Sequence, residues 1–196
     1  MQDYSLERLR ALVVEDNKYM QVLLSTILHG LGMKDIRLAS DGADAFKQIK
    51  IALPDFIICD WAMSPLDGFD FVRLVRMADD SPNPYMPIIM LTGHTEAGHV
   101  VEARDIGVNE FLAKPVSPKS LYERIQALIE QPRPFVRTAK YFGPCRRRRR
   151  DVHYAGEERR HENLPSADEN TVLLESESGE EAGGTLSNAD IDAMFD

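Results

Sequence analysis

Acidic side chains, a threonine and a lysine stand at the ends of separate apolar runs in this sequence. They are Glu15 and Asp16 after residues 9–14, Asp60 after 56–59, Thr92 after 88–91, and Lys114 after 110–113. Carboxylates brought to one place repel one another unless a cation lies between them, and hard oxygen ligands suit Mg²⁺. A nearby ammonium and hydroxyl would neutralise and orient the oxygens of a phosphoryl group. One carboxylate can then act as the nucleophile and form an aspartyl phosphate.

The apolar runs predict the strands that would hold these side chains. Runs without polar alternation, at 9–14, 36–39, 56–59, 88–91 and 110–113, are typical of parallel strands buried on both faces. Helical spacing follows them at 19–31, 43–53, 69–78, 97–106 and 117–129. The alternation predicts an α/β fold, a doubly wound (βα)5 parallel sheet. Function in such sheets gathers at the carboxyl ends of the strands, so we expect the five side chains to meet there.

Two of the predicted helices carry apolar stripes that we expect to face the sheet. The first stripe consists of Val22, Leu23, Ile27, Leu28 and Leu31, and the last of Leu121, Ile125, Leu128 and Ile129. Packing of such a face supplies most of the stability of a helix in a globular protein.

Length and composition limit the class of protein. The 196 residues, 43% of them hydrophobic, suffice for one domain of ordinary size and an extension. No apolar run approaches the roughly 20 residues of a membrane helix, and the first residues lack a secretory signal. Cys59 and Cys145 lie in dissimilar surroundings, which argues against a disulfide framework or a zinc site. We therefore expect a cytoplasmic protein with reduced thiols and no membrane partner.

The net charge of −9 is distributed in blocks along the chain. Residues 1–131 carry −6, residues 132–164 carry +6, and residues 165–196 carry −9 without a single lysine or arginine. Charge blocks outside a globular region usually mark interaction segments. The prediction is a folded domain at 9–131, an arginine-rich extension at 132–164 and an acidic, disordered tail at 165–196.

The motifs of the folded part resemble the response-regulator receiver domain of the CheY-like type. The resemblance rests on VVEDN at the first strand, DWAMSPLDG at the third, LTGH at the fourth, and Phe111 and AKP at the fifth. It implies a flavodoxin-like strand order of 2-1-3-4-5. It also implies that a histidine kinase or a phosphotransfer protein is the phosphoryl donor.

The resemblance further implies a role for each site residue. Asp60 would be the phosphoacceptor; Asp16, Asp60 and the carbonyl of Ala62 would bind Mg²⁺ directly, and Glu15 through a water; Thr92 and Lys114 would contact the phosphoryl oxygens; and Phe111 would be the aromatic switch. The bond between Lys114 and Pro115 would be cis, a form that only proline adopts at low cost.

Ala62 is a departure that bears on turnover. It offers no polar side chain to orient a hydrolytic water, so we predict slow self-dephosphorylation. A phosphatase that works through an aspartyl phosphate would have a second aspartate at this position as its general acid. The sequence therefore favours a phosphoacceptor over an enzyme.

The basic extension contains a repeat, in which YFGPCRRR at 141–148 aligns with YAGEERRH at 154–161. Glycine and proline at 143–144 and glycine at 156 predict turns, from which the arginines would leave. The segment 137–160 resembles the arginine-rich extensions of CheY-like proteins that bind c-di-GMP. The candidate ligand residues are Arg146, Arg147, Arg148, Asp151, Arg159 and Arg160. A nucleic-acid or general polyanion site, in which arginines neutralise phosphates without reading sequence, and a plain solvated linker stay open as alternatives.

The acidic tail ends in the sequence LSNADIDAMFD. Ser187 and Asp190 form a capping-box pattern, and Leu186, Ile191, Met194 and Phe195 provide an apolar face. The segment resembles the amino-terminal peptide of the flagellar motor-switch protein, to which phosphorylated chemotaxis receivers bind. A helix this short needs a partner groove, and a frayed terminus is the alternative. We expect docking on a receiver face near Arg104, Lys119 and Arg124, of the same chain or a neighbour.

Together these features predict a phosphorelay response regulator that acts in motility or chemotaxis, with the flagellar motor or another receiver as partner. The alternative is a receiver whose basic extension binds nucleic acid. It is less favoured because no DNA-reading domain follows residue 131.

Overall fold

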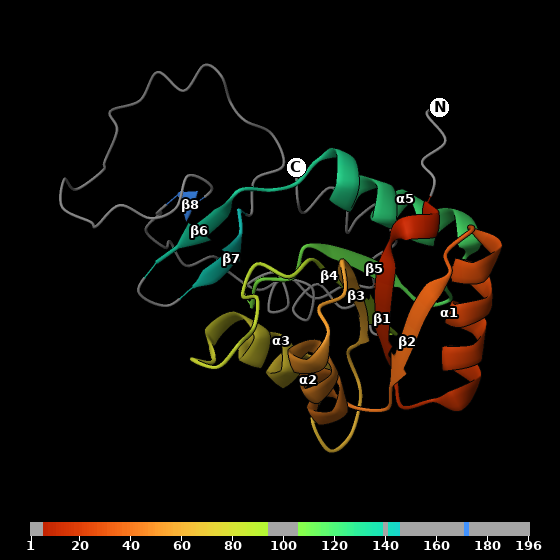
Figure 1. Cartoon of the computed structure of the whole chain (residues 1–196), viewed down its shortest axis with the longest axis horizontal. Helices are drawn as coiled ribbons and strands as arrows, with labels where there is room; N and C mark the ends of the chain where they lie inside the picture. Colours follow the sequence, from red (N-terminus) through yellow and green to blue (C-terminus); the bar gives the residue numbers. More distant parts are fainter. Residues whose placement is uncertain (1–5, 94–105, 139–140, 146–170, 173–196) are drawn as a thin grey trace.

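A five-stranded parallel sheet with helices on both faces forms most of the computed structural model, which describes residues 6–93, 106–138, 141–145 and 171–172 (Figure 1). The strands are β1 (Arg10–Val14), β2 (Asp35–Ala39), β3 (Phe56–Asp60), β4 (Ile88–Thr92) and β5 (Glu110–Ala113). Their order is β2-β1-β3-β4-β5, which confirms the predicted flavodoxin-like topology. Every residue of β3, β4 and β5 is buried, as expected for strands covered on both faces.

The helices begin where the sequence provides a capping side chain. They are α1 (Lys18–Gly30), α2 (Gly42–Ile51), α3 (Gly68–Met77) and α5 (Pro118–Glu130), and a short 3₁₀ turn, η1 (Leu6–Arg8), precedes β1. The cap residues Asn17, Asp41, Asp67 and Ser117 each accept hydrogen bonds from backbone N–H groups of the first turn. Most of the helix predicted at 97–106 lies outside the described residues.

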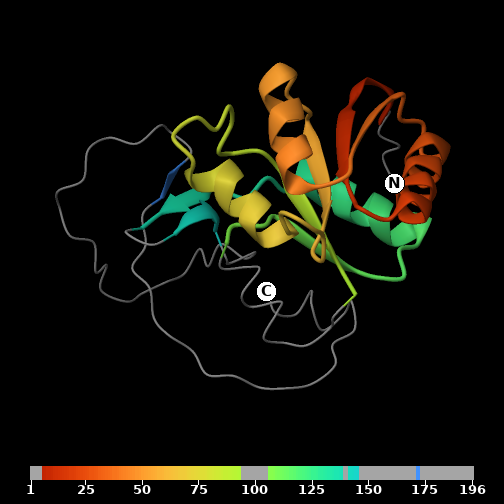
Figure 2. The ribbon, with the colours of Figure 1, turned by 90° about the horizontal axis from the view of Figure 1, so that it is seen from below.

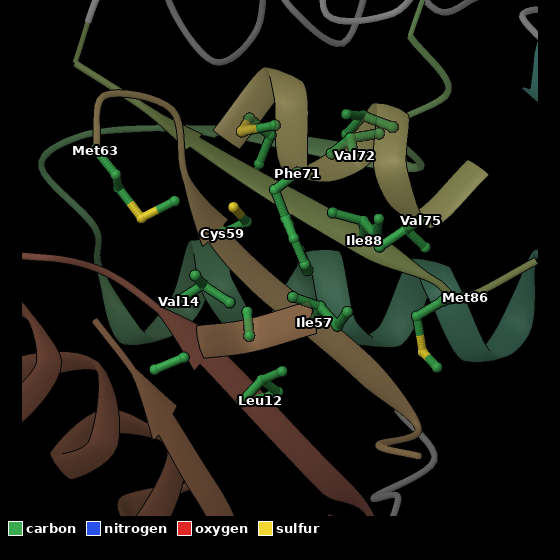
Figure 3. Close-up of a cluster of buried hydrophobic side chains, with 14 of the residues drawn as sticks. Leu12, Val14, Ile57, Cys59, Met63, Phe71, Val72, Val75, Met86 and Ile88 are labelled. Carbon is green, nitrogen blue, oxygen red and sulfur yellow. The ribbon is translucent and has the colours of Figure 1, made fainter. Parts of the chain in front are cut away.

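Alternate residues of the strands face two separate cores. One core lies under α2 and α3 and includes Leu12, Ile57, Ile88 and Phe71 (Figure 3). The other lies under α1 and α5, on the opposite face of the sheet (Figure 2). This alternation fixes which side chains can reach the end of the sheet from each face.

The apolar stripe predicted for α1 is partly wrong. Ile27 and Leu28 are buried as predicted, but Val22 and Leu23 are 66% and 44% exposed, and Gln21 and Leu24 are buried instead. The side-chain amide of Gln21 donates hydrogen bonds to the carbonyl oxygens of Glu15 (2.6 Å) and Ala39 (3.3 Å). These tertiary hydrogen bonds place a polar residue on the inner face of the helix. In α5, Leu121 and Ile125 are buried and Ile129 is 39% exposed.

A small second sheet follows α5. It consists of β6 (Phe135–Arg137), β7 (Phe142–Pro144) and β8 (Thr171–Val172), in the order β7-β6-β8. The turn predicted at 143–144 is therefore wrong, because both residues belong to β7. Gly143 is pressed against the main domain, where a Cβ atom would lie 2.6 Å from the Cα of Gly107. Within the predicted acidic tail, residues 171–172 form the strand β8, which pairs in parallel with β6.

Aromatic packing attaches this second sheet to the main domain. The ring of Tyr85 lies 5.0 Å from that of Phe135 and 5.2 Å from that of Phe142, measured between ring centroids. Tyr85 and Gly107 precede β4 and β5, so the attachment lies at the amino ends of the strands. The folded part of the chain thus continues beyond residue 131.

Arg76 on α3 holds the same junction together. Its guanidinium donates hydrogen bonds to the carbonyl oxygens of Gly107 (2.9 Å) and Pro84 (2.7 Å) and to Oδ1 of Asn109 (3.1 Å). It also lies 5.2 Å from the ring centroid of Phe135. Burial lowers the pKa of Arg76 to about 9, so the group is still charged at neutral pH.

Candidate functional site

The carboxylates singled out in the sequence meet at the carboxyl end of the sheet. Glu15 and Asp16 follow β1, and Asp60 is the last residue of β3. Because β1 and β3 are neighbours and parallel, the three side chains reach one place, and an oxygen from each lies within 4.8 Å of the others. Glu15 and Asp60 are buried, whereas Asp16 is exposed.

Lys114 enters the same cluster from the end of β5. Its Nζ lies 2.7 Å from Oδ1 of Asp60 and 3.1 Å from Oε2 of Glu15. A single ammonium group thus contacts both buried carboxylates. The following peptide bond, to Pro115, is cis, as the resemblance implied.

The charges of the cluster shift the ionisation of its members. Burial raises the pKa of Glu15, the negative charge of Asp60 raises it further, and Lys114 opposes both effects. Burial by itself would lower the pKa of Lys114, but hydrogen bonds and charge attraction from Asp60 and Glu15 raise the pKa above its usual value. Lys114 therefore stays protonated at neutral pH, because the neighbouring carboxylates favour its charged form.

The loop after β3 fixes the position of Asp60. The backbone N–H of Trp61 donates a hydrogen bond of 2.9 Å to Oδ1 of Asp60, and the N–H of Gly68 donates one of 3.0 Å to the carbonyl oxygen of Trp61. A Cβ atom on Gly68 would lie 2.2 Å from the carbonyl oxygen of Asp60, so this close approach requires glycine. Ala62 lies exposed in the same loop.

Thr92 and Phe111 lie on the two strands beside Asp60. Thr92 ends β4, and its carbonyl oxygen accepts a hydrogen bond of 2.8 Å from the N–H of Lys114. Phe111, in the middle part of β5, is 1% exposed and belongs to the core under α2 and α3. The structure thus brings Thr92 beside the lysine at the site and buries the ring of Phe111 in the core.

The donor set suits a hard divalent cation. Carboxylate oxygens from Glu15, Asp16 and Asp60 converge, and Lys114 alone does not balance their charge. Oxygen ligands of this kind are those that Mg²⁺ takes in proteins.

Comparisons with known proteins agree with this geometry. Residues 11–126 match the family described as the response regulator receiver domain. The chain belongs to this family. Its receiver domain is 29% identical over 123 residues to the chemotaxis protein CheY of Pseudomonas aeruginosa, a match that spans 63% of this chain and 98% of that protein. It is 27% identical over 125 residues to chemotaxis protein CheY-3 of Vibrio cholerae, across 64% of this chain and 95% of that one.

A solved structure shows the same fold. The receiver domain of a sensor histidine kinase from Pseudomonas aeruginosa superimposes with a TM-score of 0.56 at 30% identity, over 62% of this chain and 97% of that one. That structure is described with a magnesium ion coordinated in its active site cleft.

Among the described residues of our chain, no helix is long and apolar enough to span a membrane.

Several predicted site residues lie outside the described residues. The arginines at 146–148 and 159–160, Asp151, and the tail residues Leu186, Ile191, Met194 and Phe195 belong to this group, and so does Arg104. Of the face predicted to receive the tail, Lys119 is exposed, but Arg124 is buried and its Nη1 lies 3.6 Å from Oε2 of Glu110. Arg124 is therefore not available to an acidic peptide, because its charge already faces a buried carboxylate.

Two supporting residues of the site were not found from the sequence. Gln21 holds the backbone of Glu15, and Gly68 allows α3 to approach Asp60. The second sheet was missed as well, because β6 and β7 have only three residues each, too few to show a periodic pattern.

Proposed function

We propose that Asp60 is the phosphoacceptor of a phosphorelay response regulator. The observation that carries the proposal is the position of Lys114, whose Nζ lies 2.7 Å from one oxygen of Asp60 while Glu15 and Asp16 converge beside it. An oxygen of Asp60 would attack the phosphorus of a phosphohistidine on the donor protein. An O–P bond forms, the N–P bond breaks, and the imidazole leaves with its electron pair.

The surrounding residues would then stabilise the transferred group. The ammonium group of Lys114 and the hydroxyl of Thr92, at the end of the neighbouring strand, would contact phosphoryl oxygens. Asp16, Asp60 and the carbonyl of Ala62 would hold Mg²⁺, with Glu15 acting through a water. When bound, the ion supplies positive charge to the phosphoryl oxygens. Phe111 would change its packing in response to the contacts made by Thr92.

This chain offers an exposed apolar surface beside the site to which the phosphoryl donor could bind. The donor would be a histidine kinase or a phosphotransfer protein. α1 begins directly after Asn17, next to Glu15 and Asp16, and its residues Tyr19 and Val22 are 88% and 66% exposed. A partner that places a phosphohistidine over Asp60 would contact this end of α1.

Phosphorylation with acetyl phosphate tests the assignment of the acceptor. The protein has one tryptophan, Trp61, directly after Asp60, so its fluorescence can report the reaction. We expect a magnesium-dependent change and a mass increase of one phosphoryl group, both lost in Asp60→Asn. Asp79→Asn, which alters an exposed aspartate away from the site, serves as the matched control. Modification that persists in Asp60→Asn would refute the assignment.

We further propose that the arginine-rich extension binds c-di-GMP. The repeated Tyr, Gly and Arg-Arg pattern provides two similar arginine groups for a ligand that is itself two-fold, and arginine pairs well with phosphate and guanine. Calorimetry of the full chain with c-di-GMP, GTP and short duplex DNA tests this proposal. Selective binding of c-di-GMP that is lost in Arg147→Ala combined with Arg160→Ala supports it. Equal, salt-sensitive binding of all three ligands would favour the polyanion alternative.

The output would be motility or chemotaxis. This proposal is supported by the likeness of the receiver domain to chemotaxis proteins of two bacteria. Swimming behaviour of cells that carry Asp60→Asn tests it. Unchanged swimming and surface movement would contradict it.

A further inference from the structure

The outer surface of α3 carries an apolar groove that the site does not use. Its volume is about 390 Å³, and it is lined by Leu66, Asp70, Arg73, Leu74, Met77 and Ala78. Leu74 and Met77 are 37% and 56% exposed, although Phe71 and Val75 of the same helix are fully buried. Exposed apolar side chains that line a groove are typical of a docking surface.

The second sheet places a candidate occupant beside this groove. β7 contacts α3, and Arg76, directly before Met77, stacks on Phe135 of β6. The other edge of β6 pairs with β8, which ends at Val172. The remaining chain, residues 173–196, therefore starts from a sheet that is attached to α3.

The length of that chain suits the groove. About 13 residues separate Val172 from Leu186. A flexible linker of this length has an average end-to-end distance of roughly 20 Å. α3 has 10 residues, so it is about 15 Å long. A segment tethered in this way is present at the groove at an effective concentration on the order of millimolar.

The chemistry of the tail suits the groove as well. Its apolar residues, among them Ile191, Met194 and Phe195, match the apolar lining, and Asp190 and Asp192 flank Ile191. Arg73 on the rim is two-thirds exposed and lies 3.9 Å from Asp70 in a weak ion pair, so it can meet an acidic peptide.

We propose that residues 186–195 dock in the α3 groove of the same molecule. This differs from the face near Lys119 expected from the sequence, where Arg124 is already occupied by Glu110. One end of the groove, at Leu66, belongs to the loop between Asp60 and α3. Occupation of the groove would therefore restrain the loop that directly follows Asp60.

A spin label on the tail of the full chain tests the position of docking. The label is attached at Ala193→Cys. Cys145→Ser removes the accessible native thiol, and Cys59 can stay because it is fully buried. In NMR spectra of the isotope-labelled chain, we expect the spin label to broaden the amide signals of residues 68–78, which should lose most of their intensity. Broadening at α5 instead, or broadening nowhere, would overturn the proposal. Loss of signal in a mixture of isotope-labelled chain and separately spin-labelled chain would show docking between molecules and would also overturn it.

Matched variants test the groove itself. Met77→Asp should abolish the broadening, and so should Ile191→Ser combined with Phe195→Ser. Ile51→Asp is the control, because Ile51 is exposed on α2 and does not line the groove. Broadening that survives Met77→Asp would refute the groove as the docking site. This test needs no phosphorylation, so it stays decisive if Asp60 is not the acceptor.

Discussion

The Nζ atom of Lys114 lies 2.7 Å from Oδ1 of Asp60, although the two residues are 54 positions apart in the sequence. The same ammonium group lies 3.1 Å from Glu15, so it compensates two buried carboxylates before any cation or phosphoryl group is bound. Under the proposed function, Lys114 would both compete with a metal ion for these carboxylates and supply positive charge to phosphoryl oxygens. These two roles lead to opposite effects of one substitution.

Lys114→Met should bind Mg²⁺ more tightly and accept phosphoryl groups more slowly. Removal of a unit charge next to the carboxylates should strengthen metal binding about tenfold or more. Loss of a preorganised cation should slow phosphorylation by about 100-fold. Titration of Trp61 fluorescence with Mg²⁺ and stopped-flow phosphorylation measure the two effects. Lys119→Met is the exposed control, and a metal affinity unchanged by Lys114→Met would contradict the first role.

Gly68→Ala should destabilise the fold and disturb the acceptor loop together. The added Cβ atom would lie 2.2 Å from the carbonyl oxygen of Asp60, so the backbone must move. Overpacking of this kind costs about 1–3 kcal/mol. Gly30→Ala is the matched control, because nothing lies within 4 Å of its Cβ position. Urea unfolding and the phosphorylation rate are the measurements, and equal behaviour of the two variants would show that the loop adapts.

Glu110→Gln should be strongly destabilising. Both Arg124 and Arg133 face this buried carboxylate, at 3.6 Å and 3.2 Å. Its removal leaves two buried cations without their counter-charge, which costs about 3–5 kcal/mol. Thermal unfolding with Glu123→Gln, an exposed control on α5, checks the prediction. A loss of less than about 1 kcal/mol would mean that water reaches the arginines.

Phe142→Ala should weaken the attachment of the second sheet without affecting phosphorylation. Phe142 is buried against Tyr85 and Phe135, and truncation of a core phenylalanine costs about 3 kcal/mol. The attachment lies at the amino ends of the strands and the site at their carboxyl ends. Urea unfolding should therefore shift while the initial phosphorylation rate stays the same. Ile51→Ala, an exposed control, should change the stability by no more than about 0.5 kcal/mol.

Ala62→Asn should shorten the lifetime of the phosphorylated protein. An amide near the phosphoryl group can orient an attacking water, which the methyl group of Ala62 cannot do. The decay of phosphorylated protein after removal of the donor measures this effect, with Ala62→Val as the apolar control. A wild-type half-life of seconds that no substitution at Ala62 lengthens would refute our prediction of slow self-dephosphorylation.

The central sheet could be predicted from sequence because its information is local. The strands β1, β3 and β4 are largely apolar runs, whereas the edge strand β2 alternates polar and apolar residues. Each described helix starts at a capping residue such as Asn17 or Ser117. The positions of Glu15, Asp60 and Lys114 followed from the same pattern, because parallel strands present their carboxyl ends at one edge.

Local pattern did not decide the inner face of α1. Hydrogen bonds from Gln21 to the carbonyl oxygens of Glu15 and Ala39 outweigh the free-energy cost of leaving Val22 exposed.

By itself, the sequence determined the strand and helix order, the residues available for phosphoryl chemistry and the separation of charge along the chain. Only the tertiary structure decided that Arg124 is taken by Glu110, that the chain after α5 returns as β6 and β7, and that Gly68 must lie against Asp60. These features depend on contacts between residues that are distant in sequence, whose formation is set by burial, close packing and charge compensation in three dimensions. No local periodicity contains that information.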